Sequence, residues 1–131
     1  MSDEVFLQGF LDGSLSPEQF HHRDHLRLSW LLIRQSGIDG AGAQISAGIR
    51  AFAAHHGHPE KYHETMTQFW IRVIGHMIGV HPEISDFESF VEAFPLLLDP
   101  RLSLRHWRAE TIGNPAARAA WLEPDLLPLP A

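Results

Sequence analysis

The sequence predicts an all-α fold, arranged as a compact single domain of about five helices, and three observations support this prediction. Apolar residues recur at helical spacing along most of the chain, and no stretch alternates with period two for long enough to form a strand. Proline, serine, aspartate and glycine divide the chain at regular intervals into segments with helix starts and stops. The length of 131 residues suits one domain that buries a substantial core.

The first two helices are predicted from their caps. Ser2 or Asp3 is a good N-cap for a first short helix, and Gly13 is a suitable place for it to end. The segment Ser16-Pro17-Glu18-Gln19 combines a hydroxyl cap, a proline in the first turn and a weak capping box. We therefore expect a second helix to begin there and to end at Gly37, a left-handed terminator.

Three further helices are expected in the middle of the chain. After a turn over residues 37–43, a third helix runs to Gly57. A fourth opens at His58-Pro59-Glu60 and has the strongest apolar periodicity in the sequence. A fifth begins at the capping box Ser85-Asp86-Phe87-Glu88 and is stopped by Pro95.

The C-terminal part is expected to contain only short elements. Asp99-Pro100 starts a turn, and Asn114-Pro115 caps a last short helix that continues through Trp121. The segment 122–131 contains three of the nine prolines of the chain, which predicts an extended tail. The whole of 1–131 is expected to be one helical domain.

Composition restricts the function. The chain has no cysteine, which excludes disulfides, thiolate metal sites and cysteine nucleophiles. A net charge of −6, from 10 basic and 16 acidic residues, disfavours nucleic-acid binding. The acidic N-terminus does not resemble a signal peptide and the apolar runs are short, so we expect a cytoplasmic protein without membrane association. Ten histidines and a single lysine, Lys61, are the unusual features.

The first histidine cluster lies in Phe20-His21-His22-Arg23-Asp24-His25-Leu26. His22 and His25 are three residues apart and His21 and His25 four apart, so either pair can face one point from a helix. The apolar residues that follow place His22 and His25 at the edge of the inward face, and His21 remains an alternative to His22.

The second cluster, Lys61-Tyr62-His63-Glu64-Thr65-Met66-Thr67, places His63 at the start of the strongest apolar stripe. If the two helix starts are adjacent, His22, His25 and His63 supply three neutral nitrogen ligands for a divalent transition metal, with zinc, iron or nickel as candidates. Glu64 is then the candidate catalytic base, with a small-molecule substrate. This is the first functional hypothesis, and the sequence does not decide whether the protein is an enzyme.

Two alternatives use the same histidines differently. In one, they form a hydrogen-bond network in a non-enzymatic module that binds a small ligand or responds to pH. In the other, they only tie helix starts to the rest of the fold, so that replacing His63 by alanine lowers stability alone. The sequence identifies neither the substrate nor the oligomeric state.

The two clusters share a sequence pattern, and their motifs resemble those of a group of known proteins. Pro17-Glu18-Gln19-Phe20-His21 and Pro59-Glu60-Lys61-Tyr62-His63 both read Pro-Glu-x-aromatic-His, 42 residues apart. The motifs Phe20-x-His22-x-x-His25-Leu26 and Lys61-Tyr62-His63-Glu64-Thr65-x-Thr67 resemble a pattern of small bacterial helical proteins of unassigned function. The likeness covers roughly residues 16–75, implies an all-helical fold and favours His22 over His21.

Overall fold

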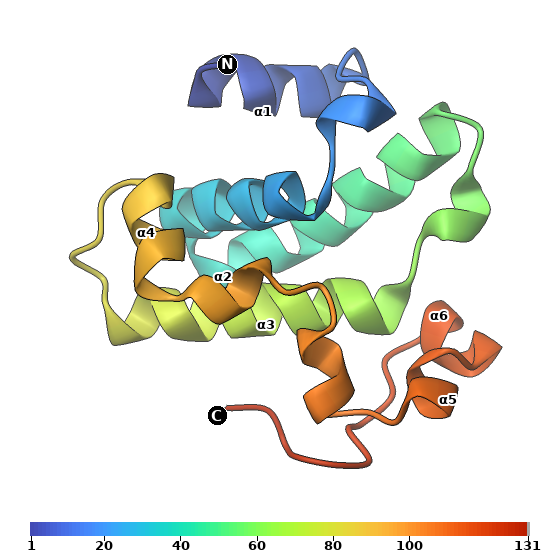
Figure 1. Ribbon diagram of the computed structural model, residues 1–131. Coiled ribbons are helices and arrows are strands. Elements are labelled where there is room, and N and C mark those ends of the chain that lie inside the picture. The colour runs from blue at the N-terminus through green and yellow to red at the C-terminus, as the bar shows by residue number, and fades with distance from the viewer. Residues whose placement is uncertain (131) are drawn as a thin grey trace.

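Six α-helices and four 3₁₀ helices form the secondary structure of the computed structural model, which describes residues 1–130 and has no strand in that range (Figure 1). The α-helices are α1 (Asp3–Asp12), α2 (His22–His55), α3 (Glu64–Val80), α4 (Phe87–Ala93), α5 (Ala109–Ile112) and α6 (Pro115–Ala119). The 3₁₀ helices are η1 (Pro17–Gln19), η2 (Pro59–Lys61), η3 (Pro95–Leu98) and η4 (Leu102–Arg105). The predicted all-α class is confirmed. Ala131, the last residue of the predicted tail, lies outside the described residues.

The two long helices α2 and α3 pack against each other and form the centre of the molecule. Helix α1 packs on α2 through the buried rings of Phe6 and Phe10, and α6 packs on α3. Figure 1 shows α1 and the C-terminal helices on opposite sides of the α2–α3 pair. Leu26, Phe69 and Ile74 are among the side chains that this arrangement removes from solvent.

The first helix begins and ends as its caps predict. The Ser2 hydroxyl accepts a hydrogen bond from the Val5 N–H at 3.1 Å. Gly13 terminates the helix at φ 79°, a left-handed conformation that glycine adopts without a steric penalty.

The predicted start of the second helix is wrong, since the N-cap is His21 and not Ser16. Ser16 and Gln19 do form a capping box, but it encloses only the single 3₁₀ turn η1. Phe20 then leaves the helical conformation and buries its ring, and α2 begins at His22 with His21 as its N-cap. The Asp24 carboxylate accepts the His21 N–H at 3.0 Å, which completes the start of α2.

The predicted turn over residues 37–43 is also wrong. Gly37 has φ 75° and ψ 162°, but it interrupts the helix at one position only, and helical backbone resumes at once and continues to the end of α2. The second half of α2 is held in place by burial, since Ala41 and Ile45 are fully buried. Two helical segments therefore meet at Gly37, as the predicted end of the second helix requires, and the second segment runs back past the first (Figure 1).

The predicted start of the fourth helix is wrong in the same way as that of the second, and the later predicted starts fall close to observed elements. His58-Pro59-Glu60 opens the 3₁₀ turn η2, and α3 begins later, at Glu64. Asp86 caps α4, which ends just before Pro95. Within residues 122–130 there is no helix, and the Leu126 N–H donates to the His106 carbonyl at 2.9 Å. No helix between residues 1 and 130 combines the length and apolarity that crossing a bilayer requires.

Candidate functional site

The two Pro-Glu-x-aromatic-His segments adopt the same local design. In each, the proline begins a 3₁₀ turn, the aromatic residue follows the turn, and the histidine is the N-cap of the next α-helix. Phe20 and Tyr62 are each only 8% exposed, so both rings turn into the protein. His21 precedes α2 and His63 precedes α3. The recurring sequence pattern therefore corresponds to a recurring structure.

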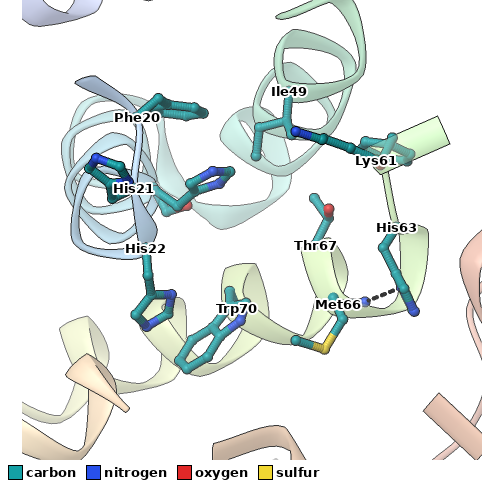
Figure 2. Close-up of a pocket in the computed structure, with 12 residues that line it drawn as sticks. Phe20, His21, His22, Ile49, Lys61, His63, Met66, Thr67 and Trp70 are labelled. Atoms are coloured by element: carbon teal, nitrogen blue, oxygen red, sulfur yellow. Dashed lines mark hydrogen bonds between the residues drawn. The ribbon is translucent and has the colours of Figure 1, made fainter. Parts of the chain in front are cut away.

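A cavity of about 330 Å³ lies between these two segments, where the start of α2, the second half of α2 and the start of α3 meet (Figure 2). The twelve side chains that line it are Phe20, His21, His22, His25, Ser29, Ile49, Lys61, Tyr62, His63, Met66, Thr67 and Trp70. All three histidines predicted as ligands are in this set, and they line one cavity.

His63 has a structural role at one end of the cavity. Its Nδ1 accepts the Met66 N–H at 3.1 Å, which caps α3, and its Nε2 donates to the Ile112 carbonyl at 2.8 Å. An Nδ1 that accepts has no hydrogen, so the ring is the neutral tautomer with its hydrogen on Nε2. Both nitrogens of His63 are thus committed to backbone groups.

His22 lies at the other end. Its Nε2 donates to the Leu97 carbonyl in η3 at 2.8 Å, and its ring meets the edge of Trp70 at 4.6 Å between centroids. Figure 2 shows Trp70 and Met66 in the space that separates His22 from His63. The two rings therefore face different parts of the main chain and not each other.

His25 is the histidine best placed to meet a ligand. Its ring stacks on Phe20 with centroids 4.0 Å apart. Burial lowers the pKa of His25 to about 4, with a smaller contribution from His22 that is partly offset by Asp24. The ring is therefore neutral at pH 7. The hydrogen bonds formed within residues 1–130 do not include its ring nitrogens, and the residue lines the cavity.

The predicted metal site is wrong. No group of three or more histidine, cysteine, aspartate or glutamate side chains in the described part of the chain could hold a metal ion. The reason is the direction of the rings, because His63 uses both nitrogens and His22 one nitrogen for backbone groups. His22, His25 and His63 therefore do not form the ligand set expected for zinc, iron or nickel.

The same contacts contradict the alternative hypothesis that the histidines form a buried hydrogen-bond network. His22 and His63 donate to the carbonyls of Leu97 and Ile112 and make no hydrogen bond to each other or to His25. None of the ten histidines belongs to the fully buried residues of the described chain, and His25 is half-buried.

Glu64 lies beside the cavity and not in its wall. Its carboxylate accepts hydrogen bonds from the Tyr62 hydroxyl and, at 3.3 Å, from Gln68, and it lies 3.8 Å from the Arg50 guanidinium. Burial raises the pKa of Tyr62, and the bond to Glu64 adds to this effect. The group borders a separate open hollow that also includes Ser46. Catalysis by Glu64 stays a prediction.

A second cavity of about 230 Å³ adjoins the first. Both are lined by Phe20, His25, Ile49, Lys61 and Tyr62, so these five side chains form the boundary between them. The sequence reasoning did not assign Lys61 to the site. The sequence feature that could have indicated Lys61 is that the only lysine of the chain lies within one of the two repeated segments.

The architecture and the cavity can be compared with known proteins. No protein-family model, curated protein or solved structure matches this chain. The chemistry of the site therefore has to be derived from its own residues.

Proposed function

We propose that the protein binds a small organic molecule with a flat apolar body in the cavity between α2 and α3. The observation that supports this most directly is the cavity itself, whose volume of about 330 Å³ lies in the range typical of small-ligand sites. The cavity also lies between the two Pro-Glu-x-aromatic-His segments, so its position follows from a local structure that occurs twice in the fold.

The walls suit a flat apolar ligand. Phe20 and Trp70 present aromatic rings, and Ile49 and Met66 add aliphatic and thioether surface. Aromatic faces attract other flat π-systems in offset or edge-to-face geometry, and methionine adapts its shape to the ligand. Figure 2 shows Phe20 and Ile49 on one side of the space and Trp70 and Met66 on the other.

A few polar groups supply orientation. The neutral ring of His25 donates from one nitrogen and accepts at the other. Ser29, one helical turn further along α2, and Thr67 on α3 also line the cavity. More than half of the twelve lining side chains carry a polar group, but most of the surface that the wall presents is apolar, as is usual for a specific small-molecule site.

A titration followed by NMR tests the proposal. Uniformly ¹⁵N-labelled protein is titrated with indole, quinoline and 2-naphthol, three flat probes that differ in their hydrogen-bonding group. We expect the chemical-shift changes to concentrate in residues 20–29 and 61–70. The variant Ile49→Trp fills the cavity and should abolish these changes, because Ile49 lies in the wall.

The matched control is Ile38→Trp, an equal change at a residue that is 40% exposed and outside the cavity, and it should leave binding intact. Shift changes spread over other surfaces, or unchanged binding by Ile49→Trp, would count against the proposal.

A further inference from the structure

The two adjoining cavities have no acidic side chain in their walls. The chain as a whole is acidic, with 16 carboxylates against 10 basic groups. Neither aspartate nor glutamate lines either cavity, whereas histidines and Lys61 line both. The walls of these two cavities therefore carry no carboxylate, although the net charge of the protein is −6.

Lys61 is the only side chain with a permanent charge in these walls. Two arginines lie nearby without lining either cavity. Arg50 lies on the Tyr62 ring at 4.4 Å and pairs with Glu64, and Arg118 donates to the Glu60 and Tyr62 carbonyls at 2.8 and 3.1 Å. The histidine at the shared boundary, His25, is neutral at pH 7 because burial lowers its pKa. Within the walls of the two cavities, the permanent positive charge therefore comes from one ammonium group.

This ammonium has no carboxylate within 4 Å among the residues described, although acidic residues flank it in sequence. Glu60 contacts the His58 ring at 3.2 Å, and Glu64 accepts from the Tyr62 hydroxyl. The carboxylate of Asp24 is engaged with the His21 N–H. In the view of Figure 2, the Lys61 side chain extends toward Ile49.

An ammonium at the edge of an apolar cavity selects a ligand with a complementary charge. Its attraction to an anion is stronger beside a low-dielectric wall than in open water. A lysine forms charge-assisted hydrogen bonds as a compact single charge, which matches a single carboxylate. The absence of wall carboxylates removes the repulsion that such a ligand would otherwise meet.

We propose that the ligand of this cavity is an organic acid, whose flat apolar body lies among Phe20, Ile49 and Trp70 and whose carboxylate binds Lys61 at the junction of the two cavities. This inference rests on the proposed function and specifies the class of ligand. A neutral molecule with the same body occupies the same place with lower affinity.

A matched pair of probes tests the inference. Indole-3-acetate and indole-3-acetamide have the same shape and differ in charge, and each is titrated into the full-length protein by NMR or calorimetry. We expect the acid to bind at least about tenfold more tightly at low salt, the gain typical of one charge-assisted hydrogen bond. The advantage should shrink as salt is added.

Three variants test whether Lys61 causes the preference for the acid over the amide. Lys61→Met keeps the aliphatic length and should remove the advantage of the acid without weakening the amide, whereas Lys61→Arg should retain most of it. Arg101→Met removes an equal charge at an exposed residue outside both cavities and should change nothing.

The two proposals fail in different ways. Equal affinities for acid and amide, or an advantage that survives in Lys61→Met, overturn the anion inference and leave the cavity as a site for neutral ligands. No binding of indole or of either derivative in the cavity overturns the proposed function, and the anion inference with it.

Discussion

The imidazole of His63 joins two parts of the chain because its nitrogens have opposite roles. One nitrogen accepts the Met66 N–H and caps α3, and the other donates to the Ile112 carbonyl at the end of α5. An alanine at this position leaves the N–H of Met66 and the carbonyl of Ile112 without these partners. We expect His63→Ala to lower the free energy of unfolding by about 1–3 kcal/mol, measured by urea denaturation.

The control for this prediction is His76→Ala. His76 is a half-buried histidine in α3 that does not line the cavity, and its ring makes no hydrogen bond to any residue from 1 to 130. This change should have little effect. His63→Asn supplies a favourable N-cap without the reach to Ile112 and should recover part of the loss. Equal losses in His63→Ala and His76→Ala would contradict the assigned role.

His25 makes stability depend on pH. Burial lowers its pKa from 6.5 to about 4 in the folded protein, so folding favours the neutral ring. The contribution is fully present above pH 6.5 and is lost as the pH falls toward 4, because the unfolded chain binds the proton more readily. The total loss from this residue is on the order of 3 kcal/mol.

Comparing the wild type with His25→Phe isolates this effect from the other titrating groups. Phenylalanine keeps a flat ring against Phe20 but does not titrate. The unfolding free energy of the wild type should therefore fall relative to that of His25→Phe as the pH is lowered from 7 to 4. Parallel pH profiles for the two proteins would disprove the assignment.

The sequence reasoning identified histidines that line one cavity but misjudged what their rings contact. Spacing within a helix predicts which side chains share a face, and His22 and His25, expected at the edge of the inward face, both line the cavity. The partners of His22 and His63 are carbonyls 75 and 49 residues away in sequence. A backbone carbonyl has no residue-specific signal in the sequence, so these partners could not be recognised. The metal hypothesis assigned to a metal ion the ring nitrogens that bind main-chain oxygens in the structure.

At the scale of the helix, the kink at Gly37 depends on the absence of a side chain. The combination of φ 75° and ψ 162° is a region that essentially only glycine populates. A Cβ at this position would touch no neighbour within 4 Å, so the penalty for Gly37→Ala comes from the backbone alone. We expect a loss of about 1–3 kcal/mol in thermal or chemical unfolding.

Gly40→Ala is the matched control, because Gly40 lies in the same helix without a left-handed φ. Its added Cβ would meet the Ser36 Cβ at 3.7 Å, an ordinary contact. Alanine should stabilise this position by up to about 1 kcal/mol, through its higher helix propensity. If both variants change stability in the same direction, the kink is not held by the glycine conformation.

The misplaced helix starts have one common cause. Proline, glutamate and a hydroxyl cap are favourable at the first turn of a 3₁₀ helix as well as of an α-helix. In both repeated segments the following aromatic ring, of Phe20 or Tyr62, is buried, and the chain leaves the helix at that residue. Tertiary burial therefore decides where α2 and α3 begin, and local sequence does not reveal it.

At the scale of the whole molecule, the Thr65 hydroxyl adds to the contacts that hold the C-terminal part onto α3. Thr65 is 0% exposed, and its Oγ1 contacts the Ala117 carbonyl at 2.6 Å and the Ala120 carbonyl at 2.9 Å and accepts the Leu122 N–H at 3.2 Å. Thr65→Val keeps the shape but leaves these backbone groups without the hydroxyl. We expect a loss of about 1–3 kcal/mol in the free energy of unfolding.

Thr65→Ser retains the hydroxyl and removes only a methyl group, so it should lose less than Thr65→Val. Hydrogen exchange of the amides of residues 117–122 gives an independent measurement, since local release of this segment should speed their exchange in the valine variant. Unchanged exchange in that variant would show that other contacts hold the segment.

The all-α class and most elements could be predicted, because caps and helical periodicity are local properties of sequence. The cavity could not, because it depends on how α2 bends at Gly37 and returns past the start of α3. Lys61 became meaningful only when its surroundings were known, since a single lysine has no periodicity to interpret.

The anchoring of His22 and His63 to main-chain oxygens has a consequence for how such a protein varies. A carbonyl oxygen is present whatever side chain a residue has, so positions 97 and 112 can exchange one apolar residue for another and keep both bonds. Adding or deleting one residue nearby would move the oxygens out of register. In a set of natural variants we therefore expect the histidines to be accompanied by fixed loop lengths, and by no particular amino acid at either anchor.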